Sequence, residues 1–316
     1  MNPNTPVFKV KEYAETNFDP IFLPKQVPNP LEWPRISIVT PSYNQGQFIE
    51  ETIRSVLLQG YPNLEYIIID GGSTDNSVEI IKKYEKYLTY WVSEPDQGQS
   101  HAINKGFQRC TGEIMAWLNS DDFYLPHALE DIAKIFISRD DIDLVTGAWL
   151  SYDNETENLV MTRACGTGIS PNISVMLSKD AHLGQHSTFW RSKVWQTVGT
   201  LREDLHYAMD HEFFLRCCDL HLKFKLTSKP LAAFRRYLEQ KTGNWDKYAT
   251  ESQKIISEYK AKHSEWNIFW GKIKIYFAKL LWSLSSHRNI HPRLGLKPKF
   301  DEQLVRSWLE ALNSKN

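Results

Sequence analysis

Between residues 113 and 122 the sequence reads Glu113-Ile-Met-Ala-Trp-Leu-Asn-Ser-Asp121-Asp122, an apolar run that stops on two adjacent carboxylates. The apolar part, Ile114 to Leu118, has the length and composition of a buried strand. Negative charge at the rim of a core costs energy unless a cation offsets it. The natural partner of such a pair is a hard divalent cation that carries phosphate. The stretch therefore predicts a strand of a buried sheet that ends at a ligand site.

Similar strand-like runs alternate with helical patterns on both sides of this stretch. We expect strands at 36–40, 64–69, 90–92, 114–118 and 142–149, and helices at 47–59, 98–109 and 126–137. Steady alternation of this kind is typical of an α/β domain with a Rossmann-like, mostly parallel sheet and helices on both faces. Such sheets bind ligands at the carboxyl ends of their strands. The segments expected at those ends are Tyr43-Asn44, Asp70, Glu94-Pro-Asp96 and Asp121-Asp122.

Composition narrows the possible functions. The chain has 316 residues, 41% of them hydrophobic, and a net charge of −1, which argues against a dedicated nucleic-acid binder. Its four cysteines show no CxxC pair and no metal-ligand spacing, which favours a reducing compartment. No signal peptide and no stretch long enough to span a membrane is recognisable, so we expect a cytoplasmic protein.

The pattern divides the chain into three parts. Residues 1–34 are rich in proline and read as an extended leader, 35–243 form the α/β domain, and 244–316 form a basic helical tail with an amphipathic helix at 300–312. Residues 254–299 hold ten basic and two acidic side chains, a net +8 on a body of net −9. Aromatic side chains from Trp266 onward form a helical stripe among lysines. That helix either lies at the inner face of a membrane through 266–299 or docks on protein, and both remain open.

Three candidate sites also have plain structural interpretations. Asp121-Asp122 could be a capping turn, although its place after a buried strand favours function. The small-residue turn at Asp70-Gly71-Gly72 permits close approach of a ligand, but it also suits an ordinary strand-to-helix turn. Neither a dinucleotide fingerprint nor a P-loop follows the first strand. Asp210 could act as a general base or as an acid at a helix N-terminus.

Several motifs together resemble family 2 glycosyltransferases of the GT-A fold. They occur in the family's order over roughly 35–243 and read Ile38-Val-Thr-Pro-Ser-Tyr-Asn-Gln, Ile69-Asp-Gly-Gly-Ser-Thr-Asp, Asp96-Gln-Gly-Gln-Ser-His-Ala-Ile-Asn-Lys-Gly, Gly112-Glu-Ile-Met-Ala-Trp-Leu-Asn-Ser-Asp-Asp and Ala208-Met-Asp-His-Glu-Phe-Phe-Leu-Arg. The resemblance implies transfer of a sugar from a nucleoside diphosphate donor with inversion, using Mg²⁺ or Mn²⁺. The tail 244–316 lies outside the stretch that carries the resemblance and would form a C-terminal helical appendage to the GT-A domain.

On the donor side, the resemblance implies that Pro41 and Tyr43 line the nucleotide base, with Tyr43 stacking on it. Asp70 would contact the nucleoside. Asp96 and Asn104, from the third motif, would belong to the same nucleotide-sugar site.

For the chemistry, the resemblance implies that Asp121 reaches the ribose or the donor sugar and that Asp122 binds the metal that bridges the diphosphate. Asp210 matches the family's catalytic base. The sequence departs from the common pattern at Gly71 and Met209, where many relatives have acids, and at Ile103, where many have arginine. These departures leave the nucleotide base and the sugar open.

The acceptor is expected to be a hydroxyl of a glycan or of a lipid-linked sugar, in the biosynthesis of a surface polysaccharide, with self-association of the chain left open. Two other functions stay possible. A non-catalytic subunit could bind the sugar nucleotide or a glycan with the same residues. A sugar-1-phosphate nucleotidyltransferase would need a basic, glycine-rich loop after the first strand, and Pro41-Ser-Tyr-Asn-Gln is neither.

Overall fold

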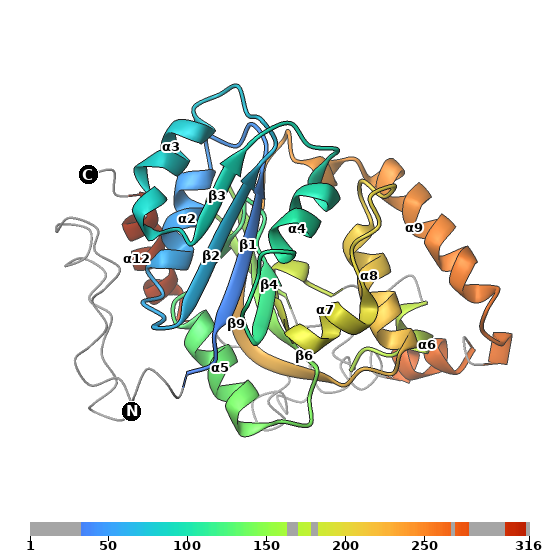
Figure 1. Cartoon of the computed structure of the whole chain (residues 1–316). Coiled ribbons are helices and arrows are strands. Elements are labelled where there is room, and N and C mark those ends of the chain that lie inside the picture. The colour runs from blue at the N-terminus through green and yellow to red at the C-terminus, as the bar shows by residue number, and fades with distance from the viewer. Residues whose placement is uncertain (1–32, 163–169, 178–182, 267–268, 278–300, 314–316) are drawn as a thin grey trace.

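The computed structural model describes residues 33–162, 170–177, 183–266, 269–277 and 301–313. Within these residues nine strands form one curled sheet (Figure 1). The strands are β1 (Ile36–Ser42), β2 (Leu64–Asp70), β3 (Tyr90–Ser93), β4 (Ile114–Trp117), β5 (Phe123–Tyr124), β6 (Leu144–Asp153), β7 (Leu159–Thr162), β8 (Thr188–Arg191) and β9 (Phe224–Arg236). Their order is β3-β2-β1-β4-β8-β6-β9-β5, with β7 paired to β6.

Helices cover both faces of this sheet (Figure 1). They are α2 (Ile49–Leu57), α3 (Ser77–Lys83), α4 (Gln99–Phe107), α5 (Ala128–Ser138), α6 (Ile173–Met176), α7 (Ser192–Val198), α8 (Met209–Asp219), α9 (Trp245–Lys260) and α12 (Glu302–Asn313). In Figure 1, α2, α3 and α5 lie on one side of the strands, and α4, α7 and α8 lie on the other. The α/β fold predicted from the alternating pattern is confirmed.

The strands of the first half follow the expected parallel arrangement. β1 pairs in parallel with β2 and with β4, and β2 pairs in parallel with β3. Side chains alternate between the two faces of each strand. In β2, Tyr66 and Ile68 pack in the core under α2, while Ile67 and Ile69 pack in the core under α4. The carboxyl ends of β1, β2 and β4 therefore meet at one edge of the sheet.

The second half differs from a simple parallel sheet. β8 runs antiparallel to both β4 and β6, and β9 then runs parallel to β6. The segment 185–191 begins as a 3-10 turn at Gln185–Ser187 and becomes β8 only from Thr188. The helix expected to begin near Asp210 is α8, and Asp210 lies in its first turn.

Parts of the C-terminal tail pack on the body. Ile255 and Tyr259 of α9 are buried in the core that also contains α8. Trp308 of α12 is buried, and its Nε1 donates a hydrogen bond to the carbonyl oxygen of Tyr124 at 2.9 Å. Residues 269–277 are helical, and Ile275 is buried there. None of the helices in the described ranges is long and apolar enough to cross a membrane.

The aromatic stripe of the tail faces outward in its described part. Trp266, Phe269, Trp270, Tyr276 and Phe277 are exposed, and their rings contact one another. The opposite face of the helix is the one that packs on the protein. Residues 1–32 and 278–300 lie outside the described residues.

Candidate active site

A cavity of about 740 Å³ opens where the strands β1, β2 and β4 end. The N-terminus of α8 and the segment that follows β9 form its other wall. The predicted site residues in its lining are Pro41, Tyr43, Asp96, Asp121 and Asp210. Five residues from distant motifs therefore share one cavity, as the topology of the sheet predicts. The other three predicted residues, Asp70, Asn104 and Asp122, do not line it.

The β1 end supplies an apolar floor and an aromatic ring. Pro41 is buried near the C-terminal end of β1, while Tyr43 is 61% exposed at the rim of the cavity. An exposed ring at the rim offers its face to a planar ligand. This placement is compatible with the expectation that Tyr43 stacks on a nucleotide base.

Asp70 stabilises the turn that follows β2 and does not line the cavity. It is fully buried, and its Oδ2 accepts hydrogen bonds from the backbone N–H of Gly72 and Ser73 and from the Ser93 hydroxyl. Its Oδ1 accepts a hydrogen bond from the Ser73 hydroxyl at 2.5 Å. A carboxylate with both oxygens engaged in this way fixes the loop. Its expected contact with the nucleoside stays a prediction.

Gly71, next to Asp70, makes room for the carboxylate of Asp96. A Cβ at position 71 would lie 2.6 Å from Oδ2 of Asp96, so any larger residue would displace that side chain. Asp96 is held at the cavity wall because its Oδ1 accepts the Gly98 N–H at 2.7 Å. The departure from the family pattern at position 71 thus has a local steric reason.

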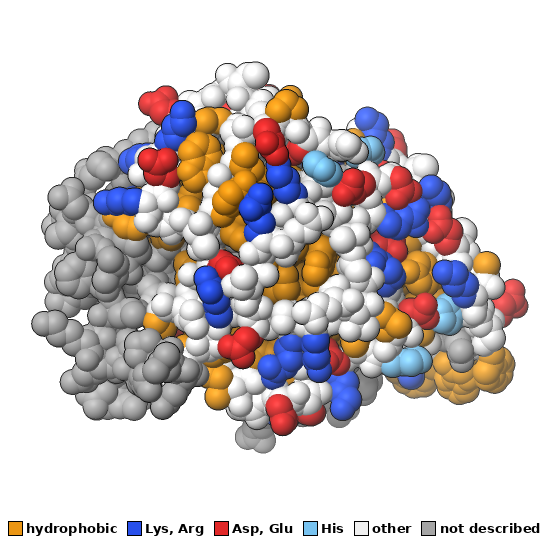
Figure 2. Space-filling model, in the orientation of Figure 1, with side chains coloured by type: hydrophobic (Ala, Val, Ile, Leu, Met, Phe, Trp, Pro, Cys, Tyr) orange, Lys and Arg blue, Asp and Glu red, His pale blue; other side chains and the backbone are white. Residues whose placement is uncertain are grey.

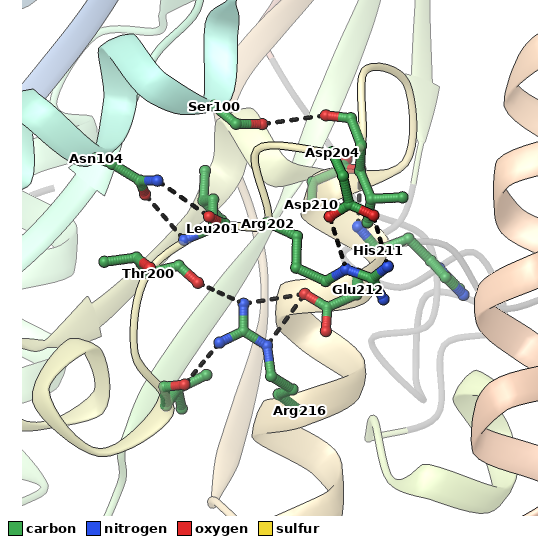
Figure 3. Close-up of polar contacts among 12 residues, drawn as sticks. Ser100, Asn104, Thr200, Leu201, Arg202, Asp204, Asp210, His211, Glu212 and Arg216 are labelled. Carbon is green, nitrogen blue, oxygen red and sulfur yellow. Dashed lines mark hydrogen bonds and ion pairs between the residues drawn. The ribbon is translucent and has the colours of Figure 1, made fainter. Parts of the chain in front are cut away.

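Asn104 connects two elements and does not contact the cavity. It is buried on α4, its Nδ2 donates to the Leu201 carbonyl at 3.0 Å, and its Oδ1 accepts the Leu201 N–H at 2.8 Å (Figure 3). Its Nδ2 also donates to Glu203 at 2.8 Å. Ser100, one turn earlier, donates to the carbonyl of Leu205. Both side chains fasten α4 to the loop that leads into α8. Asn104 therefore fastens the loop that precedes Asp210, and its expected contact with the nucleotide sugar stays a prediction.

The two adjacent acids face different surroundings. Asp121 is half-buried and lines the cavity, where its Oδ2 accepts a hydrogen bond from the Tyr237 hydroxyl at 3.0 Å. Asp122 is only 1% exposed, and its Oδ1 accepts the backbone N–H of Arg235 at 3.0 Å. Asp122 therefore lies behind the wall. Asp121 is the acid of the pair that lines the cavity, and the assignment of the metal to Asp122 stays a prediction.

A divalent cation fits the turn that holds Asp121 and Asp122 on electrostatic grounds. Burial raises the pKa of both carboxyls, and the charge of Asp121 raises the pKa of Asp122 further. Oδ2 of Asp122 is buried without a hydrogen-bond partner, so the turn holds more negative charge than its own donors satisfy. In the described ranges no group of three acidic, histidine or cysteine side chains is arranged as a metal site. A magnesium-like ion at one carboxylate takes its other ligands from phosphate and water.

Asp210 has the properties of a general base. Burial raises its pKa from 3.8 to about 6, while the N–H of His211, which donates to Oδ1 at 2.7 Å, and the charge of Lys241 act in the opposite direction. A carboxylate of this pKa is ionised at neutral pH and still basic enough to accept a proton. The cavity therefore holds a metal-compatible acid and a base on separate walls.

The backbone that carries Asp210 is anchored from two sides. Glu251 of α9 accepts hydrogen bonds from the N–H groups of His206, Tyr207 and Ala208 at 2.7–3.0 Å. Arg216 donates to the carbonyls of Val198 and Thr200 and pairs with Glu212 (Figure 3). These contacts hold the first turn of α8 against the cavity. Because Glu251 lies beyond the expected domain limit at 243, α9 contributes to the site.

The structure adds cavity residues that the motifs did not indicate. Nζ of Lys241 donates to Oε1 of Gln99 at 2.9 Å, and the Nε2 of Gln99 donates to Oδ1 of Asn119 at 2.8 Å. All three residues line the cavity, as do Tyr237 and Tyr248. Gln99 and Asn119 lie inside quoted motifs and could have been chosen for their polarity. Lys241 and the tyrosines follow β9, where no sequence pattern marks them.

Arg235 holds the acidic turn from behind. It is buried, its Nε donates to the Asp121 carbonyl at 2.9 Å, and its Nη1 donates to Asn154 at 2.7 Å. Its Nη2 pairs with Glu51 of α2. One side chain thereby joins the end of β4, α2 and the turn after β6.

Comparisons with known proteins agree with this geometry. The model of the family described as Glycosyl transferase family 2 matches residues 37–212. TuaG of Bacillus subtilis, a glycosyltransferase named for teichuronic acid biosynthesis, is 38% identical over 111 residues, 34% of this chain and 43% of that protein. An uncharacterized glycosyltransferase of Rickettsia typhi is 26% identical over 202 residues, 62% of this chain and 63% of that protein. The chain thus spans less than two thirds of the length of these relatives.

Two solved structures share the fold. TarS of S. aureus, residues 1–349 in complex with UDP-GlcNAc, has a TM-score of 0.59 at 17% identity over 88% of this chain and 79% of that chain. The mannosyltransferase PcManGT of Pyrobaculum calidifontis, in complex with GDP-Man and Mn²⁺, has a TM-score of 0.57 at 14% identity over 96% of this chain and 91% of that chain. At these identities the likeness establishes the GT-A fold. Because the family model also covers more than half of its length, the chain belongs to glycosyl transferase family 2.

Proposed function

We propose that this chain is an inverting glycosyltransferase that moves a sugar from a nucleoside diphosphate donor to a hydroxyl of a glycan or lipid-linked acceptor. The observation that carries the proposal is the position of Asp210, a carboxylate with a pKa raised to about 6, across one cavity from Asp121. The nucleotide-sugar complexes of TarS and PcManGT support the class of donor. Their nucleotides and sugars differ, so they do not select one donor for this chain.

In this mechanism Asp210 accepts the proton of the acceptor hydroxyl. The acceptor oxygen bonds to the anomeric carbon as the bond from that carbon to the diphosphate breaks, and attack from the opposite face inverts the centre. Asp121 would hold Mg²⁺ or Mn²⁺, which neutralises charge on a departing diphosphate. The Mn²⁺ in the PcManGT complex supports this ion class. Lys241, whose charge acts on both Asp121 and Asp210, would stabilise negative charge between them.

The decisive experiment compares the wild type with Asp210→Asn. Removing a positioned general base costs about 10²–10⁴ in rate. We expect the variant to keep the thermal stabilisation that a nucleotide sugar and Mn²⁺ give the wild type, and to lose diphosphate release by that factor. Equal turnover by the variant would refute the assignment. A wild type that binds donors tightly but releases no diphosphate would instead be a binding subunit.

The name of the B. subtilis relative supports a role in surface polysaccharide biosynthesis, which we propose for this chain as well. We also propose that the tail touches a membrane surface through Trp266, Phe269 and Trp270, which form an exposed aromatic cluster at the lower right of Figure 2. Exposed lysines flank it at 260, 262, 272 and 274. Aromatic rings with neighbouring lysines suit the interface of an anionic bilayer. A cytoplasmic protein at the inner membrane face would then meet a lipid-linked acceptor there.

A further inference from the structure

A second hollow continues from the active-site cavity along the segment after β9. It is an open groove of about 420 Å³ lined by Leu238, Glu239, Gln240, Gly243, Asn244, Trp245 and Asp246. Glu239 and Gln240 also line the cavity that holds Asp210. The groove therefore adjoins the cavity that holds Asp210.

Two aromatic side chains in contact lie at the junction of the two hollows. Trp245, the first residue of α9, is 69% exposed, and its ring meets that of Tyr248 edge to face at 6.1 Å between centroids. Tyr248 lines the cavity, near enough to Asp210 that the charge of Asp210 acts on its hydroxyl. Leu238 is 89% exposed on the same groove. Large apolar side chains kept exposed beside a cavity mark an interaction site.

The polar part of the groove is already built. Nε2 of Gln240 donates to the carbonyl of buried Arg235 at 2.6 Å, and Oδ1 of Asn244 accepts the Lys247 N–H at 3.4 Å at the start of α9. Both amides are therefore fixed in place, each with its other polar atom available to a ligand. Glu239 and Asp246 add two carboxylates, and none of the seven residues that line the groove is basic.

This combination matches the chemistry of a sugar chain. A pyranose ring presents an apolar face of C–H groups, which packs on an aromatic ring, and a rim of hydroxyls, which bonds to amides and carboxylates. Two carboxylates without a basic partner in the lining disfavour an anionic ligand. We propose that the groove binds the second and following units of an uncharged oligosaccharide acceptor, with Trp245 stacking on a sugar ring. The proposal rests on the proposed glycosyl transfer, whose acceptor it specifies as an oligosaccharide.

The test measures capture of immobilised bacterial surface glycans of one to eight units by the full chain, with Mn²⁺ and UDP or GDP present. Neutral glycans of three or more units should bind at least tenfold better than monosaccharides and than glycans of the same length that contain uronic acids. Trp245→Ala should lose this binding at least tenfold, and Trp245→Phe should restore part of it. Trp266→Ala is the matched control, because Trp266 is similarly exposed, at 65%, on the tail. It should bind like the wild type.

Three results would overturn the inference: no capture of any glycan by the wild type, equal capture by Trp245→Ala, or no dependence on glycan length. Release of nucleoside diphosphate from donors to water, measured on the same proteins, separates this from a failure of the proposed function. Hydrolysis of the donor needs the cavity and no glycan, so it reports the proposed transfer chemistry independently of glycan capture. If the wild type releases no nucleoside diphosphate, the glycosyltransferase proposal is contradicted, whereas the glycan-binding measurement remains valid.

Discussion

The raised pKa of Asp210 predicts how transfer depends on pH. With a pKa of about 6, the fraction of ionised Asp210 falls from about 90% at pH 7 to about 10% at pH 5. A carboxyl at its ordinary value of 3.8 would still be more than about 90% ionised at pH 5. We therefore expect kcat/KM, measured as diphosphate release at substrate concentrations below saturation, to fall about tenfold between pH 7 and pH 5.

Lys241 provides the control for this pH profile. Its charge lowers the pKa of Asp210, so Lys241→Met should move the acidic limb of the profile to higher pH. Thermal-shift titrations of donor and Mn²⁺ at each pH separate loss of binding from loss of the base. A limb near pH 4 in the wild type, or a shift to lower pH in Lys241→Met, would refute the assignment of this limb to Asp210.

The same shift has a consequence for stability. A carboxyl whose pKa is higher in the folded state binds its proton more tightly there, so the charged form destabilises the fold above pH 6, and this penalty disappears below pH 3.8. A difference of about two pKa units corresponds to at most about 3 kcal/mol. Asp210→Asn should therefore raise the free energy of unfolding at pH 8 by up to about that amount and have little effect near pH 3.8. A variant that is less stable at pH 8 would contradict the desolvation of Asp210.

Two other predictions concern the metal and the tail. Asp121→Asn should lose the extra thermal stabilisation that Mn²⁺ gives in the presence of a nucleoside diphosphate, whereas Asp122→Asn should keep it, because Asp122 lies behind the wall. The reverse result would return the metal to Asp122. In flotation with anionic vesicles, the wild type should float and the double variant Trp266→Ser, Trp270→Ser should not. Trp245→Ser, an exposed tryptophan outside the cluster, is the control, and a double variant that still floats would exclude the cluster as the membrane contact.

The periodicity of the sequence predicted where the acids would gather but not which way each would point. Alternating strands and helices brought the ends of β1, β2 and β4 to one edge, and Asp96, Asp121 and Asp210 do line one cavity there. Whether a carboxylate faces a ligand or its own loop depends on nearby backbone N–H groups. The backbone N–H groups of Gly72 and Ser73 both donate to Asp70, so its carboxylate faces its own loop. No pattern of residue types distinguishes these two outcomes.

A similar limit applies to the different surroundings of Asp121 and Asp122. Both acids lie in the short turn between β4 and β5, and only Asp121 lines the cavity. Which one does so is decided by β9, because the backbone N–H of Arg235 binds Asp122 and the Tyr237 hydroxyl binds Asp121. That partner strand lies more than 110 residues later in the chain. These hydrogen bonds depend on the tertiary structure, so the sequence around Asp121 and Asp122 does not predict them.

The segment from β9 into α9 accounts for most of what the motifs missed. It orients Asp121 through Tyr237, places the charge of Lys241 near Asp210, and fixes the start of α8 through Glu251. A limit at residue 243 divides this segment between the domain and the tail, although the cavity uses residues on both sides of it. Because the motif residues hold the donor-side loops while this segment supplies the wall beside Asp210, differences in acceptor among related chains should concentrate after β9. Trp245, exposed at the junction, is where such a difference would first change which glycan is bound.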